Sequence, residues 1–115
     1  MEAKERDVAY YVPRSGRSVP FREWLDGLRD RAARIAVTVR IARMRGGNFS
    51  DSRPIGAGAS ESRIHTGPGY RIYYGIDGNK IVLLLGGDKS SQTLDIRTAL
   101  KYWQDYRERK KHEAK

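Results

Sequence analysis

Five side chains between positions 63 and 89 have the types and spacing needed to act on a phosphate group. Arg63 and Arg71 lie on two predicted neighbouring strands, and Lys89 lies in the loop after the next strand. Arginine suits phosphate because its planar guanidinium donates to two oxygens at once. His65 shares the predicted face of Arg63 and is of a type that exchanges protons near neutral pH, and Tyr73 shares a face with Arg71 and can stack on a base or donate a proton. If the side chains of Arg63 and Arg71 share one face, they form a positively charged surface that fits one phosphate, and Lys89 could complete it.

Each of these residues also has a structural interpretation. Arg71 lies on an otherwise apolar strand, where an arginine is costly unless it faces a solvated groove. Alternatively, Arg71 has a structural role and stabilises the sheet through an ion pair with Glu61 or Asp88. Lys89 can be a solvated loop lysine, and a lone histidine on a strand is more often structural. These alternatives stay open at the level of sequence.

The charge of the chain bears on its partners. There are 23 Lys and Arg against 14 Asp and Glu among 115 residues, a net charge of +9. Such an excess attracts polyanions, which include nucleic acid, an acidic protein and an anionic membrane face. A solubilising surface is the other interpretation. A second predicted helix concentrates the charge and can either hold ribosomal RNA or present a solvated face; its arginines are Arg31, Arg34, Arg40, Arg43 and Arg45.

Several classes of protein are disfavoured by composition. The chain has no cysteine, so it has neither a disulfide framework nor a thiolate metal site. His65 and His112 are far apart, and we expect no metal and no cofactor. No apolar run approaches the roughly 20 residues that span a bilayer, and the charged first residues lack the apolar segment of a secretory signal. We expect one domain over residues 1–115, in the cytoplasm, with no membrane partner.

Hydrophobic periodicity predicts runs of helices and runs of strands, which is typical of the α+β class. The N-cap of the second helix is assigned to Asp30, and Ser90 or Ser91 is expected to cap the last helix. Residues 48–60 are interpreted as a loop, with a brief extended piece at Arg53 and Ile55 as the alternative, and residues 107–115 as a frayed tail. The predicted elements are a strand at 7–12, helices at 20–28 and 31–45, strands at 61–66, 70–76 and 81–85, and a final helix from 92.

Three sequence pieces carry a resemblance to a known family. They are Glu61-Ser-Arg63-Ile, Gly69-Tyr-Arg71-Ile-Tyr-Tyr74, and the segment from Ile81 through Gly-Gly-Asp-Lys89-Ser-Ser-Gln92 to Asp95-Ile96. With this layout, the chain resembles the RelE/ParE-like toxins of bacterial toxin–antitoxin modules, above all the phage-derived HigB-like addiction module killer group. The likeness runs from about Val8 to Tyr106, and its most distinctive part is the third piece.

The resemblance implies a fold and a set of partners. The fold is RelE-like: an N-terminal strand, an antiparallel helical hairpin, a three-stranded antiparallel meander that completes one sheet, and a C-terminal helix. The partner is a cognate antitoxin, commonly a helix-turn-helix protein, and operator DNA is met only through the antitoxin complex. RelE-like members cut messenger RNA on the ribosome, whereas ParE-like members share the fold and poison DNA gyrase, so the family fixes the fold better than the target.

The resemblance also implies roles for the candidate residues. RNA can be cleaved without metal when the ribose 2′-OH attacks the adjacent phosphate and expels the 5′-oxygen, so the protein supplies alignment, charge and proton transfer. Arg63, Arg71 and Lys89 match positions where RelE-like toxins carry basic catalytic residues, and His65 and Tyr73 are candidates for proton transfer. The residues do not single out a general base. The alternatives are a gyrase inhibitor without chemistry of its own and a basic RNA-binding module without activity.

Overall fold

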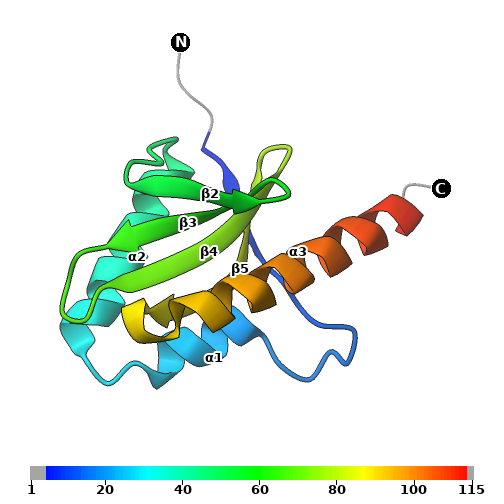
Figure 1. Ribbon diagram of the computed structural model, residues 1–115. Coiled ribbons are helices and arrows are strands. Elements are labelled where there is room, and N and C mark those ends of the chain that lie inside the picture. Colours follow the sequence, from blue (N-terminus) through cyan, green and yellow to red (C-terminus); the bar gives the residue numbers. More distant parts are fainter. Residues whose placement is uncertain (1–4, 114–115) are drawn as a thin grey trace, which may run out of the picture.

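The chain forms one open five-stranded sheet with helices on both of its faces (Figure 1). The computed structural model describes residues 5–113. The expected α+β class is confirmed, with the final helix crossing one face of the sheet. The elements are β1 (Asp7–Tyr10), α1 (Pro20–Gly27), α2 (Arg31–Arg45), β2 (Ser52–Gly56), β3 (Ala59–Ile64), β4 (Tyr70–Asp77), β5 (Lys80–Asp88), a short 3₁₀ helix η1 (Lys89–Ser91) and α3 (Gln92–Glu113).

The strands are ordered β1-β5-β4-β3-β2 across the sheet. β1 pairs with β5 in parallel, and the other neighbours are antiparallel, so the predicted meander of β3, β4 and β5 is confirmed. β4 lies at the centre and is buried on both faces rather than on one, as its alternation had suggested. Ile72 and Tyr74 face the cluster under α1 and α2, whereas Tyr73 faces the cluster under α3.

Helices α1 and α2 cover one face. α1 begins at Pro20, where a missing N–H costs nothing, and Asp30 caps α2 by accepting from Ala32 N at 2.9 Å. α1 packs mainly on β5 and α2 against β3, rather than chiefly against each other as in the expected helical hairpin. The sheet offers each helix its own apolar patch. Trp24 of α1 lies so close to Gly86 that a Cβ there would be 2.0 Å from the indole ring.

The loop predicted at 48–60 is interrupted by a strand, at the place where Arg53 and Ile55 suggested a brief extended piece. Residues 52–56 form the edge strand β2, which pairs with β3 through a turn at Ala57 and Gly58. Pro54 is tolerated because an edge strand needs no donor on its outer side. The Ala57 carbonyl accepts from Trp103 Nε1 at 2.8 Å and from Arg107 Nη1 at 3.0 Å, so α3 holds this turn in place. The polar composition of this segment does not predict a strand, because the strand is stabilised by contacts with α3, which lies far away in the sequence.

The prediction of a frayed tail from residue 107 is also wrong for the described part of the chain, since α3 continues to Glu113. Lys110 Nζ pairs with Asp77 at 3.1 Å, and Arg109 pairs with Asp105 at 3.0 Å. Basic side chains in the last turn also favour a helix C-terminus electrostatically. Residues 114–115 lie outside the described residues. Within residues 5–113, no helix combines the length and apolar character that crossing a membrane requires.

Asp105 of α3 anchors the segment that follows β1. Its carboxylate accepts from the Tyr11 hydroxyl at 2.7 Å and from Arg14 Nε at 2.9 Å. These hydrogen bonds hold the pKa of Asp105 below its ordinary value. Burial and the same carboxylate raise the pKa of Tyr11 to about 12. This contact fixes one side of α3, the helix whose other end reaches the candidate site.

Replacing Asp105 by asparagine is expected to give a pH-dependent loss of stability. A carboxyl group with a depressed folded-state pKa stabilises the fold above its unfolded value of about 3.9 and loses that contribution as pH falls through the folded value. Its side chain is 23% exposed, so we expect a loss of about 1–2 kcal/mol at pH 7 and much less at pH 2. Urea unfolding of both proteins at the two pH values measures this, and an equal deficit at both would contradict it.

Candidate functional site

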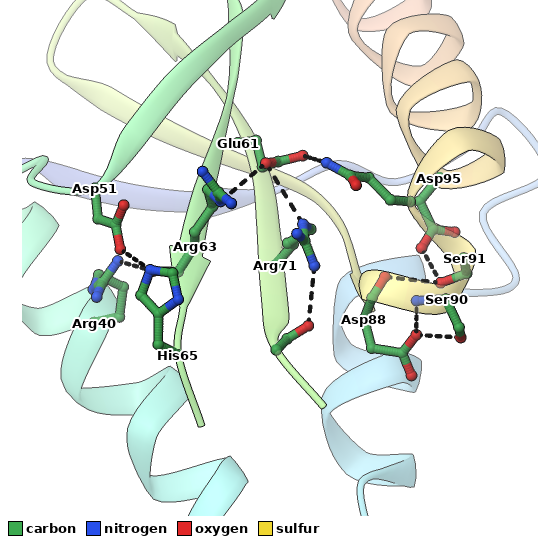
Figure 2. Close-up of polar contacts among 12 residues, drawn as sticks. Arg40, Asp51, Glu61, Arg63, His65, Arg71, Asp88, Ser90, Ser91 and Asp95 are labelled. Atoms are coloured by element: carbon green, nitrogen blue, oxygen red, sulfur yellow. Dashed lines mark hydrogen bonds and ion pairs between the residues drawn. The ribbon is translucent and has the colours of Figure 1, made fainter. Parts of the chain in front are cut away.

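Two arginines face each other on the α3 side of the sheet and share one acid. Arg63 of β3 is directly opposite Arg71 of β4 in the strand register. Like charges in that position repel, and Glu61, two residues before Arg63 on the same face, lies between them and compensates. Glu61 Oε1 lies 3.6 Å from Arg71 Nε and 3.9 Å from Arg63 Nε (Figure 2).

This cluster is largely closed to solvent. Glu61 is fully buried and Arg71 is 5% exposed, whereas 31% of the Arg63 side chain is exposed. The expectation that Arg71 faces a solvated groove is therefore wrong, and the alternative of an ion pair with Glu61 is confirmed. The other carboxylate oxygen of Glu61 accepts from Gln92 Nε2 at 3.0 Å, which ties the first residue of α3 to the sheet.

Lys89 reaches the same region through the backbone. Its N–H donates to the Gly69 carbonyl at 3.0 Å, and Arg71 Nη1 donates to the same carbonyl at 3.2 Å. The Lys89 side chain is exposed. The loop is held by Asp88, which caps η1 by accepting from Ser90 N at 2.8 Å. The three predicted cations are thus linked through Glu61 and Gly69, two of them with exposed surface.

His65 lies beside this cluster and turns away from it. The residue follows the end of β3, and its Nε2 lies 2.6 Å from Asp51 Oδ2, with 69% of the side chain exposed. Figure 2 shows the imidazole directed toward Asp51 rather than toward Glu61. An acid that fixes the orientation of an exposed imidazole is a usual arrangement for proton transfer.

Tyr73 is separated from solvent. The side chain is fully buried in the cluster under α3, so no surface is left on which a base could stack. Burial, followed by the charges of Glu61 and Asp95, raises its pKa, and among the described residues its hydroxyl has no hydrogen-bond partner. The carboxyl of Asp95 packs on Gly87, where a Cβ would lie 1.9 Å from Oδ2, and burial raises the pKa of Asp95.

Other features of the described chain do not enlarge this site. A hollow of about 960 Å³ lies between the second half of α3 and the strand turns, and none of the predicted site residues lines it. Its floor includes Leu100, Trp103 and Tyr106. Across residues 5–113, no group of three or more His, Asp or Glu side chains is placed to hold a metal ion.

Comparison with known proteins gives one informative relative. The chain is 40% identical over 83 residues to an uncharacterized protein of Haemophilus influenzae, a match that covers 71% of this chain and 84% of that protein. The chain belongs to the family of this Haemophilus protein. No family model matches the chain, and no solved structure is significantly similar to it. Membership in the family of the Haemophilus protein carries a shared fold and leaves the chemistry to be argued from the site.

Three further polar side chains lie around the site, and the sequence predicted the observed partner of none of them. Gln92 and Asp95 dock the start of α3 on the sheet, and Arg40 of α2 turns inward, donating to the Arg63 carbonyl at 2.7 Å and to Ser62 Oγ at 2.9 Å. Arg40 is therefore not part of a solvated arginine face. The signal for Asp95 lay in the paired glycines at the end of β5, because glycine inside a strand marks a close approach.

Proposed function

We propose that this chain is the toxin of a type II toxin–antitoxin module and that it is a metal-independent endoribonuclease acting on messenger RNA at the ribosome. The observation that carries the proposal is that Arg63 and Arg71 share Glu61, while the Lys89 backbone is held at the Gly69 carbonyl that also accepts from Arg71. The resemblance to RelE-like toxins supports it, as does the charge of +9, which favours association with RNA.

The cations divide into two roles in this proposal. Lys89 is exposed and Arg63 is partly exposed, and these two side chains would hold the oxygens of the scissile phosphate. Arg71 is buried and would act behind them, by fixing Glu61 and the Gly69 carbonyl and thereby positioning the two exposed cations. Preorganised cations stabilise the additional charge that develops on the phosphate as the 2′-oxygen attacks.

His65 is the residue best placed to move a proton. In the reaction, the 2′-OH loses a proton as its oxygen bonds to phosphorus, and the 5′-oxygen gains one as its bond to phosphorus breaks. His65 is exposed, oriented by Asp51, and two residues from Arg63. Tyr73 is buried, so it would contribute through packing and not by contact with RNA.

A ParE-like gyrase inhibitor is the second candidate. The burial of Arg71 favours it, because an arginine engaged with Glu61 needs no substrate to explain its presence. In that case the exposed cations would have no phosphate geometry to meet, and exchange of Arg63 for lysine would be tolerated. In both cases the proposed partner is an antitoxin, most simply a helix-turn-helix protein encoded beside this chain, which brings the complex to operator DNA.

Brief expression in bacteria separates these functions. We expect growth arrest together with new messenger RNA 5′ ends that are phased with codons, while plasmid supercoiling by purified gyrase is unaffected. Inhibited supercoiling with intact messages would replace the proposal by the gyrase inhibitor. Salt-dependent RNA binding with neither effect would leave a binding module without activity.

A further inference from the structure

The outward surface of α2 combines positive charge with exposed apolar side chains. The helix has arginine at five of its 15 positions and contains neither aspartate nor glutamate. Its inward side is formed by Ala33, Val37 and Met44. The opposite side, here termed the α2 outer face, consists of Arg31, Arg34, Ile35, Thr38 and Val39, which line a shallow hollow of about 290 Å³.

Two aliphatic side chains of this face are open to solvent. Ile35 is 54% exposed and Val39 is 45% exposed. They are four residues apart, so they lie one above the other on the helix surface. A single exposed aliphatic side chain is ordinary, whereas these two adjoin and line one hollow, so the helix carries a small apolar patch.

The arginines of the α2 outer face are available for a partner. Within residues 5–113, neither Arg31 nor Arg34 pairs with an acid, whereas Arg40 is turned to the sheet and Arg45 pairs with Glu5 at 3.2 Å. The face therefore presents two unpaired positive charges beside its apolar pair. The complementary surface is acidic and apolar.

We propose that the α2 outer face binds an acidic amphipathic helix of a partner protein. Apolar side chains at three- and four-residue spacing on the partner would pack on Ile35 and Val39, as ridges of one helix fit the grooves of another. Its Asp or Glu side chains would meet Arg31 and Arg34. RNA fits less well, because phosphates would satisfy the arginines and leave the two aliphatic side chains uncovered.

A designed helical peptide tests this proposal directly. The probe has leucines at three- and four-residue spacing flanked by glutamates, and the comparison peptide has the same composition with its leucines spread around the helix. We expect the aligned peptide to shift amide NMR signals chiefly in residues 31–43 and to bind at least about 10-fold more tightly than the scrambled peptide. The double variant Ile35→Asn/Val39→Asn should weaken binding at least about 10-fold.

A matched variant and a competing ligand keep the test decisive. Leu94 of α3 is 64% exposed and lies outside the α2 outer face, so Leu94→Asn should change affinity less than about twofold. Equal binding of both peptides, or wild-type affinity in the double variant, would overturn the proposal. Polyuridylate serves as the competing ligand. If it displaces the peptide, and if the double variant, which keeps both arginines, binds RNA with unchanged affinity, then the α2 outer face binds nucleic acid through its arginines and the proposal is overturned. The inference does not rest on the proposed function, because Arg63 and Lys89 lie outside the α2 outer face.

Discussion

Replacing Glu61 by glutamine is expected to lower the free energy of unfolding by about 3–5 kcal/mol, because it leaves a buried arginine without a counter-charge. Arg71 is 5% exposed, and Glu61 is the acid with which it pairs within the described chain. Glutamine preserves the shape of the side chain, so the loss would report the charge rather than a cavity. The hydrogen bond from Gln92 is also weakened, since a neutral acceptor replaces a carboxylate.

Urea unfolding at pH 7, followed by the fluorescence of Trp24 and Trp103, measures this loss. The matched control is Glu108→Gln, an exposed acid on α3, which should stay within about 0.5 kcal/mol of the wild type. A free energy of unfolding for Glu61→Gln within about 1 kcal/mol of the wild type, twice the range allowed for the control, would contradict the prediction. Arg71 would then not depend on this acid for its stability.

The second large effect concerns the two exposed cations of the candidate site. The double variant Arg63→Gln/Lys89→Gln is expected to abolish growth arrest while folding normally. Loss of one preorganised charge-stabilising donor commonly lowers a rate by about 100-fold or more. Stability should change little, because removing Arg63 relieves its repulsion with Arg71, which offsets the loss of its 3.9 Å contact with Glu61, and because Lys89 is exposed. Growth of cells that express each protein, with the protein level followed in parallel, measures the effect.

A second double variant removes the same charge from another surface. Arg97→Gln/Lys101→Gln changes two exposed cations of α3 that lie outside the candidate site. It should remain toxic, because only overall charge is lost. Toxicity retained by Arg63→Gln/Lys89→Gln would remove these two residues from the proposed chemistry, and detoxification by both variants would indicate a role for net charge alone.

The sequence predicted the elements that are periodic over their own length. Asp30 caps α2 as expected, and the β3–β4–β5 meander follows from alternation and turn residues. The errors fall where order comes from remote contacts. β2 is polar and is held at Ala57 by α3, and the end of α3 is fixed to the sheet by the ion pair of Lys110 with Asp77. Local pattern carries no trace of such partners.

The candidate site was predictable in its residues and less so in its exposure. Alternation placed Glu61 and Arg63 on one face, and the strand register adds Arg71 to it, which the sequence had left as a condition. The burial of Arg71 and Tyr73 was not predicted. It arises because α3 covers this face of the sheet, and the path of α3 across the sheet cannot be predicted from the sequence. The pairing of His65 with Asp51 was missed for another reason, because Asp51 belongs to the segment interpreted as a loop, whose path could not be predicted.

The most direct test of the proposed chemistry is a single-turnover assay of messenger RNA cleavage on purified, programmed ribosomes, with EDTA-washed toxin and gel-resolved products. For Arg63→Gln/Lys89→Gln, the account predicts a rate constant at least about 100-fold below that of the wild type, whereas Arg97→Gln/Lys101→Gln should stay within about threefold. Cleavage at the wild-type rate by the first variant, or no cleavage by the wild type itself, would contradict it.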